Sequence, residues 1–225
     1  MSHIPPVMGY AGPQTFSEAF IPSHGRAKLA LIFLWIFIAL NALLKLLSTA
    51  LVFSVDMEAA MTTRPVPSWL MLVGIGLIVG GLSYFVLFIL LVVFYLRWQH
   101  QAHKNLYALG KYPRFTPGWG VGWWFIPIVQ LWKPYQNLKD VGIQSDSTGR
   151  GFEPLPWYWF CWIASMIVSS IANNFEDEPT VAAMIDLCAL ALEIGAAWLL
   201  TRYIQFVVEK QPALLSGAQS VRSYR

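Results

Sequence analysis

Charged side chains are scarce in this chain. Of its 225 residues, 12% are Asp, Glu, Lys or Arg, whereas a soluble domain usually carries about 25%. So few charges leave too little polar surface to cover a globule that faces water on all sides. Hydrophobic residues make up 56% of the chain, and they gather in a few long runs, for which the lipid bilayer is the natural solvent.

Cysteine is also scarce, because the chain contains only Cys161 and Cys188. Both lie in apolar runs, which argues against a disulfide framework and indicates small core residues. The motifs of serine hydrolases, zinc proteases and nucleotide-binding enzymes are missing. The sequence therefore predicts no catalytic residue, no cofactor and no nucleic-acid partner, and it argues against an enzyme.

Histidine offers little for a metal site. His100 and His103 are spaced i, i+3, which suits a metal, but no Cys, Asp or Glu lies close in sequence to complete the site. We interpret the pair as a solvated helix end and predict no metal. No histidine lies within an apolar run, which argues against haem held by two histidines.

Four apolar runs are long enough, or nearly so, for a helix of about 20 residues to cross the bilayer. The runs cover about residues 29–55, 69–96, 157–174 and 181–208. The first run is too long for the apolar core of a signal peptide, which spans about 7–15 residues, so we expect a retained helix. The sequence predicts an all-α bundle of four transmembrane helices over residues 27–208, with cytoplasmic tails at 1–26 and 209–225.

An aromatic, proline-containing segment, residues 117–135, separates the second span from the third. It is apolar for about 15 residues, which as a helix would cover about 23 Å and fall short of a crossing. Pro127 interrupts any helix there. We predict an interfacial or shallow re-entrant segment, with a fifth span as the alternative. Aromatics that favour the headgroup level are Trp119, Trp123, Trp124, Trp132 and Tyr135.

The distribution of Lys and Arg predicts the orientation. Thirteen of the fifteen fall in the N-terminal tail, the 97–150 loop or the C-terminal end from Arg202. The opposite side has only Arg64, and Lys45 lies within a span. Cytoplasmic loops carry the Lys and Arg excess, so we expect both termini and the long loop in the cytoplasm of a bacterium, with the spans in its inner membrane. A fifth span would move three of these cations outside.

The stretch from Tyr95 to Asp140 carries a long and unusual motif. It contains Arg97-Trp98, His103, Asn105 and Leu109-Gly110, followed by Phe115-Thr-Pro-Gly-Trp-Gly-Val-Gly-Trp-Trp-Phe-Ile-Pro-Ile and Leu131-Trp-Lys-Pro-Tyr-Gln136. The motif resembles the bacterial membrane family called domain of unknown function four-three-two-eight. The resemblance implies a multi-span membrane protein with this loop between its second and third spans. It carries over no activity, ligand or catalytic residue.

Ionisable side chains occur within two of the predicted spans, where each needs a partner. Lys45 and Asn41 lie one turn apart, and Asp186 and Glu193 lie seven residues apart on one face. Counted from the outer helix ends, Lys45 lies about 15 Å deep, Glu193 about 18 Å and Asp186 about 8 Å. We therefore predict that Lys45 and Glu193 pair. The alternatives are a polar path through a transporter and a structural ion pair with one snorkelling carboxylate, and the absence of inverted repeats favours the second.

Gly76 and Gly80 form a GxxxG pair in the second span. Small residues at this spacing let two helix backbones approach closely, so we expect a helix contact here. The alternative is that glycine is common in membrane helices and marks no contact.

Basic residues flank the aromatic segment and suggest contact with anionic lipid headgroups, to which each cation near the surface contributes about 1 kcal/mol. They are Arg97, Lys104, Lys111, Arg114, Lys133 and Lys139. The alternative is that they only set the topology. The first functional hypothesis is a non-enzymatic membrane module that binds lipids or partner membrane proteins. The second is a small transporter or channel that uses Lys45, Asp186 and Glu193.

Overall fold

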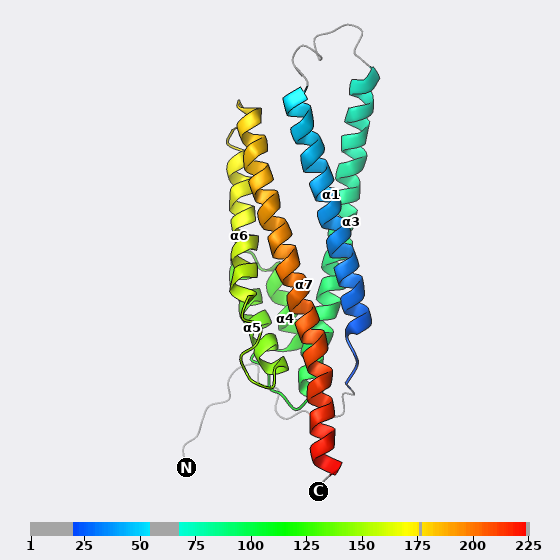
Figure 1. Cartoon of the computed structure of the whole chain (residues 1–225), viewed down its shortest axis with the longest axis vertical. Coiled ribbons are helices and arrows are strands. Elements are labelled where there is room, and N and C mark those ends of the chain that lie inside the picture. Colours follow the sequence, from blue (N-terminus) through cyan, green and yellow to red (C-terminus); the bar gives the residue numbers. More distant parts are fainter. Residues whose placement is uncertain (1–19, 55–67, 176, 224–225) are drawn as a thin grey trace. The chain divides into compact units, whose positions relative to one another are not determined.

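The computed structural model describes residues 20–54, 68–175 and 177–223, and the regular structure in these ranges is entirely helical (Figure 1). The predicted all-α fold is confirmed. Most of the N-terminal tail predicted at 1–26 and the connection that holds Arg64 lie outside the described residues. In chain order the elements are α1 (His24–Ser54), α3 (Ser68–Ala108), α4 (Pro117–Gly122), η1 (Trp123–Phe125), η2 (Val129–Leu131), α5 (Lys133–Ser145), α6 (Leu155–Ala172) and α7 (Pro179–Ser223).

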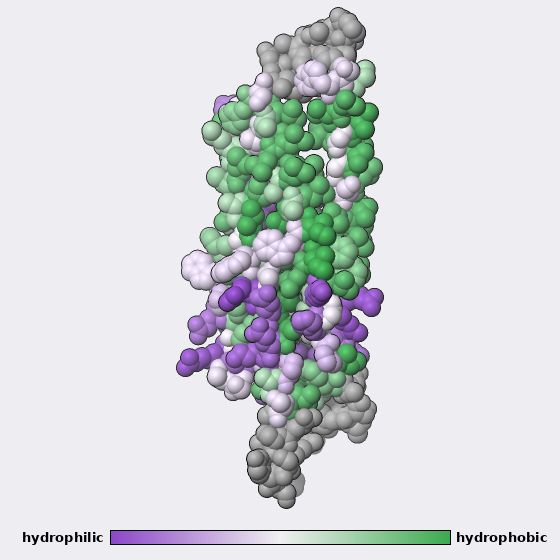
Figure 2. Space-filling model, turned by 45° about the vertical axis from the view of Figure 1, so that its right-hand side comes forward, coloured by the Kyte–Doolittle hydropathy of each residue, from purple (hydrophilic) through white to green (hydrophobic). Residues whose placement is uncertain are grey.

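Helices α1, α3, α6 and α7 are each long and apolar enough to cross a membrane. Their outward side chains are apolar, as Leu72 and Ile78 of α3 show with 69% and 66% of their surface exposed. Figure 2 shows hydrophobic residues over most of the visible face of these helices. Large exposed apolar surfaces are unstable in water. The chain is a multi-pass membrane protein with four spans, as the sequence predicts.

Proline marks the beginning of four helices. Pro117, Pro134, Pro156 and Pro179 lie in the first turns of α4, α5, α6 and α7. Backbone N–H groups in the first helical turn have no partner within the helix, so proline, which lacks an N–H, is tolerated there. Its ring also fixes φ near the helical value. Thr116 also caps α4, because its hydroxyl accepts a hydrogen bond from the Trp119 N–H at 3.4 Å.

The last helix is longer than its apolar run. We expected a polar tail from residue 209, but α7 continues to Ser223. Tyr203, Val207 and Gln211 are fully buried and recur every four residues, so they share one packed face. This burial continues the helix past its membrane-spanning part, and a cytoplasmic position for residues 209–225 stays a prediction.

The chain divides into two compact units. Unit 1 comprises Met1–Lys28, Tyr95–Glu153 and Arg202–Arg225, and unit 2 comprises Leu29–Phe94 and Pro154–Thr201. Unit 2 contains the apolar parts of the four long helices. Unit 1 contains the beginning of α1, the C-terminal parts of α3 and α7, and the short helices α4, η1, η2 and α5. Each unit is described separately below.

Unit 2 is packed through apolar and aromatic contacts. Phe33 of α1 stacks on Phe94 of α3, with ring centroids 4.6 Å apart. Gly80 of α3 faces α1, because a Cβ placed there would lie 2.8 Å from Leu44 Cδ2. Gly76 has no neighbouring atom within 4 Å of the same position. Within unit 2, only Gly80 of the GxxxG pair makes a close helix contact.

Unit 1 has a core of large side chains and amides. Trp98 and Leu138 are fully buried. The Tyr203 hydroxyl donates to the Leu138 carbonyl at 2.7 Å, and the Trp98 and Tyr203 rings meet edge to face at 6.2 Å. Gln211 donates to the Ala102 carbonyl at 2.8 Å. These bonds hold α3, α5 and α7 together within this unit.

The aromatic segment 117–135 folds into α4, η1, η2 and the start of α5. Each of the first three is too short to cross a bilayer. Between η1 and η2, Ile128 has φ 66° and ψ −54°, and the Val129 N–H donates to the Pro127 carbonyl at 2.7 Å. This is a γ-turn of the rare, strained hand. An interfacial or re-entrant position stays a prediction.

Candidate functional site

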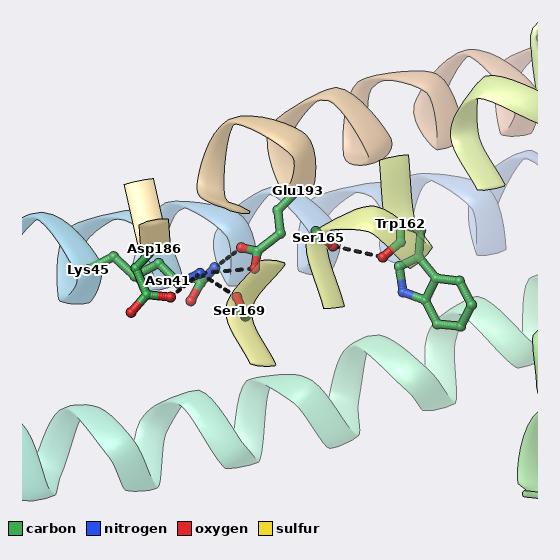
Figure 3. Close-up of polar contacts among 7 residues, drawn as sticks. All are labelled: Asn41, Lys45, Trp162, Ser165, Ser169, Asp186 and Glu193. Carbon is green, nitrogen blue, oxygen red and sulfur yellow. Dashed lines mark hydrogen bonds and ion pairs between the residues drawn. The ribbon is translucent and has the colours of Figure 1, made fainter. Parts of the chain in front are cut away.

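A polar cluster lies among the apolar helices of unit 2 (Figure 3). Lys45 Nζ of α1 lies 3.1 Å from Glu193 Oε1 of α7 and 3.7 Å from Asp186 Oδ1. It also donates to Ser169 Oγ of α6 at 3.4 Å. The structure thus places the pair that helix depth predicts, and it brings Asp186 to the same ammonium group.

Both oxygens of Glu193 have partners. Oε1 accepts from Lys45, and Oε2 accepts a hydrogen bond from Asn41 Nδ2. In contrast, 40% of the Asp186 side chain is exposed, against 18% for Lys45. Removing charged groups from water is costly unless they are paired and hydrogen-bonded. Glu193 satisfies this condition, and Asp186 is the carboxylate left most accessible.

The cluster lines a cavity of about 520 Å³ within unit 2. Ser165 and Ser169 of α6 and its C-cap residue Asn173 are spaced four residues apart and present one polar face to the cavity. All four long helices contribute. The lining residues are Asn41, Lys45, Tyr84, Ser165, Met166, Ser169, Ser170, Asn173, Asp186 and Glu193.

The ionic groups give the cavity a net negative charge. One ammonium faces two carboxylates, so a single negative charge is left when all three are ionised. The remaining polar groups are hydroxyls and amides. Their oxygens can coordinate hard cations and can form hydrogen bonds with water. The cavity can therefore hold a small cation or a chain of waters, whereas an anion would meet repulsion.

Sequence reasoning found the charged members of this cavity and Asn41 but missed Tyr84 and the polar face of α6. Serine and asparagine are ordinary residues in an apolar run, so each alone carries little signal. The spacing of Ser165, Ser169 and Asn173 was the available signal.

In unit 1, part of the predicted aromatic and basic set forms one cluster. Trp119 stacks on Trp123 at 4.6 Å. Lys133 Nζ lies 5.4 Å from the Phe115 ring centroid and 5.8 Å from that of Trp123. The guanidinium carbon of Arg114 lies 5.6 Å from the Phe115 ring centroid. A cation over an aromatic face is attracted by the ring quadrupole. This group, Arg114, Phe115, Trp119, Trp123 and Lys133, is called the aromatic–basic cluster below.

The other predicted contact residues differ in burial. Trp124 donates from Nε1 to Gln99 Oε1 at 3.0 Å, so it belongs to the packing of unit 1. Trp132 is 43% exposed. Arg97 and Lys139 are exposed, and Lys104, Lys111 and Tyr135 are half-buried.

A buried polar group stands beside α4. The Nε2–H group of His103 donates to the Phe115 carbonyl, 2.6 Å away. A Cβ at Gly120 would lie 3.1 Å from His103 Nδ1 and 3.0 Å from Asn137 Nδ2. His103 and Asn137 are both fully buried. The prediction of a solvated helix end at His103 is wrong, because α3 continues into the core of unit 1.

At the other end of unit 1, Asp146 links α5 to α7. The Thr148 hydroxyl donates to its carboxylate, and Lys210 Nζ lies 3.5 Å from Oδ1. These partners, the hydroxyl first, hold the pKa of Asp146 below its usual range, against the opposing effect of burial.

Metal chemistry has little support within the described ranges. No group of three or more His, Cys, Asp or Glu side chains is placed to hold a metal ion there. Cys161 is half-buried and Cys188 exposed, and both are free thiols.

Comparison with known proteins places the chain in a family. No curated protein matches it, and no solved structure matches it. The model of the family described as Domain of unknown function (DUF4328) matches residues 75–208. The matched range is more than half of the chain and includes the whole aromatic segment, Asp186 and Glu193, while Asn41 and Lys45 precede it. The chain therefore belongs to the DUF4328 family, as its Trp-Pro motif predicts.

Proposed function

We propose that the protein is a small transporter or channel that carries a proton or another small cation through the cavity of unit 2. The observation that supports this best is the cavity itself, about 520 Å³ of open space that the three ionic side chains line among helices whose outer surfaces are apolar. A structural ion pair needs no such space, and its side chains would be enclosed by apolar neighbours. Intramembrane ionisable residues that line a cavity are typical of ion and proton paths.

Asp186 is the proposed entry group for the cation. Its side chain is the most exposed of the three ionic ones, and it shares Lys45 with Glu193. A cation that binds Asp186 weakens the attraction between Lys45 and Asp186. The ammonium then keeps Glu193 as its partner at 3.1 Å, so the site can load and release charge without leaving Lys45 unpaired.

The proposed location is a bacterial inner membrane, with both termini in the cytoplasm. Thirteen of the fifteen Lys and Arg residues belong to the three stretches that form unit 1. Only Lys45 and Arg64 belong to unit 2. An excess of Lys and Arg marks the cytoplasmic side of a membrane protein, and this supports unit 1 as the cytoplasmic unit.

Flux through proteoliposomes tests the transport function. The purified chain is reconstituted, and uptake of protons, Na⁺ and K⁺ is followed with ion-sensitive dyes. We expect Asp186→Asn to lower the flux at least tenfold, because it removes the accessible negative charge. Asp177→Asn is the matched control, since it makes the same change at an exposed turn residue outside the cavity, and it should leave the flux unchanged.

A double substitution separates transport from stability. Changing Lys45 alone leaves both carboxylates without their cation and costs about 3–5 kcal/mol. Changing Glu193 alone leaves Lys45 paired only with Asp186, so the single variants are poor tests. Lys45→Met combined with Glu193→Met removes both charges and keeps the side-chain volumes similar. We expect this variant to fold, with an unchanged elution profile, and to lose its flux. Full flux in the double variant, or no flux of any of the three ions in the wild type, would contradict the proposal.

A second candidate function is contact with anionic lipids or a partner membrane protein. It is favoured by the apolar side chains that the segment 117–135 exposes next to the aromatic–basic cluster. Trp119 is 52% exposed, Phe125 65% and Ile128 70%. Aromatic and aliphatic side chains beside cations suit the bilayer interface. A protein with only this function would be unaffected by the double substitution at Lys45 and Glu193.

A further inference from the structure

Unit 1 contains a cavity of its own, with a volume of about 450 Å³. It is an open pocket formed by the beginning of α1, the polar part of α3 and the short helix α4. Its lining residues are Arg26, Leu96, Arg97, His100, Gly118 and Val121.

The charged side chains of this pocket are all basic. Two guanidinium groups and an imidazole face it, and the lining contains no carboxylate. Within residues 20–54, 68–175 and 177–223, neither Arg26 nor Arg97 forms an ion pair. An arginine pair that faces a cavity without a counter-charge attracts an anion.

Buried amides hold Arg26 in place. Its guanidinium donates to Gln101 Oε1, and Gln101 Nε2 donates to Asn105 Oδ1 at 2.9 Å. Asn105 Nδ2 in turn donates to the Ile21 carbonyl at 2.9 Å and to Gln211 Oε1 at 3.2 Å. Gln101, Asn105 and Gln211 are buried, so this amide network holds one N–H group of Arg26 in a defined position. The other N–H groups of the guanidinium can bind a ligand in the pocket that Arg26 lines.

The shape and composition of the pocket indicate what it accepts. Guanidinium groups bind phosphate through two parallel hydrogen bonds, and this planar fork favours phosphate over a spherical anion. Gly118 leaves open space, since a Cβ there would meet no atom within 4 Å. Leu96 ends the apolar run of α3 and Arg97 follows it directly, so apolar and basic lining meet at this point, as acyl chain and phosphate meet in a phospholipid.

We propose that this pocket binds a phosphate group through Arg26 and Arg97, and that its usual source is the headgroup of an anionic phospholipid. His100 completes the polar lining. The proposal is independent of cation transport through unit 2, because it rests on different residues in a different unit.

Lipid binding by the full-length protein tests this site. The chain is purified in detergent and titrated with dioleoyl phosphatidylglycerol, and bound lipid is counted by native mass spectrometry. We expect Arg97→Gln to weaken binding about tenfold or more. Arg150→Gln is the matched control, because it makes the same change at an exposed arginine of unit 1 outside the pocket, and it should bind like the wild type.

Two further arms keep the result interpretable. Arg26→Gln should weaken binding similarly, but it also removes the bond to Gln101. The decisive variant is Arg97→Gln, because the Arg97 side chain is exposed and makes no hydrogen bond within the described residues. Displacement of the lipid by millimolar inorganic phosphate would support the phosphate site and assign it to soluble phosphate. Retention of the lipid would support the headgroup. Equal binding by wild type and Arg97→Gln, or an equal loss in Arg150→Gln, would overturn the proposal.

Discussion

Gly120 lies against the two buried polar side chains His103 and Asn137. An added methyl group would approach Asn137 Nδ2 to 3.0 Å and His103 Nδ1 to 3.1 Å, closer than ordinary van der Waals contact. Neither side chain has free space around it, since both are fully buried. We predict that Gly120→Ala lowers the free energy of unfolding by about 1–3 kcal/mol, the usual cost of overpacking, measured as a lower melting temperature in detergent.

Gly118, in the same short helix, is the control for this substitution. A Cβ at Gly118 would meet no atom within 4 Å. Gly118→Ala should leave the melting temperature unchanged or raise it slightly. Alanine lowers the conformational entropy of the unfolded chain and meets no clash in the folded one, which adds about 0.4–1 kcal/mol to the free energy of unfolding. Equal losses at both positions would show that α4 is sensitive to any side chain, and the close approach to Asn137 would not be the cause.

Individual ionic residues were predictable from the sequence, and their polar neighbours were not. A charge in an apolar run is rare enough to be a signal by itself, and the fixed rise of a helix gives its depth, which is how Lys45 and Glu193 were matched. Ser169 and the buried amides Gln101 and Gln211 carry no such signal. Their roles follow from which helix faces meet, and composition does not determine this.

The turn at Ile128 is the most strained part of the segment 117–135. A β-branched residue with φ 66° is a backbone outlier, yet its side chain is 70% exposed and gains nothing from protein packing. We predict that Ile128→Gly raises the melting temperature in detergent, by about 2–4 °C if it relieves about 1 kcal/mol. In return, the segment should insert less deeply into lipid, measured as weaker quenching of tryptophan fluorescence by brominated phospholipid.

Ile126 provides the comparison for this turn. Its backbone is extended, with φ −97° and ψ 112°, so Ile126→Gly relieves no strain and should lower the melting temperature. If Ile128→Gly behaved in the same way, the strain at residue 128 would have to be compensated elsewhere. If quenching stayed unchanged, contact of Ile128 with lipid would be refuted.

Elements were predicted well where the apolar pattern defines them and poorly where it ends. All four spanning helices follow from runs of apolar residues. In α6 and α7, Pro156 and Pro179 also mark the first turn. The continuation of α3 to Ala108 and of α7 to Ser223 depends on burial in unit 1. Residues such as Gln99 and Gln211 look solvent-exposed in a sequence, because their hydrogen-bond partners lie on other helices.

For the molecule in its membrane, the distribution of cations makes a prediction about sidedness. In a background with Cys161→Ala and Cys188→Ala, single cysteines are introduced at Thr62 and at Ser147. The expected orientation puts residue 62 outside the cell and residue 147 in the cytoplasm. A membrane-impermeant maleimide should therefore label Thr62→Cys on intact bacterial cells and should reach Ser147→Cys only after lysis.

Lysed cells provide the control, since both cysteines should then react. Labelling of Ser147→Cys on intact cells would reverse the orientation and would place unit 1 on the outer face. Labelling of both positions on intact cells would indicate a mixed topology. Either outcome would contradict the assignment of the basic residues to the cytoplasmic side.

Unit 1 is assembled from three stretches that are far apart in the chain. Asn105 bonds to Ile21 and to Gln211, so its hydrogen bonds cannot be completed until the residues after the last span have left the ribosome. A chain cut after residue 201 would still carry four segments that the insertion machinery can recognise, but its Tyr95–Glu153 stretch would lack Tyr203 and Gln211. The inserted protein would then have an unfinished polar unit, and we expect quality-control proteases to degrade it faster than a protein that contains residues 202–225.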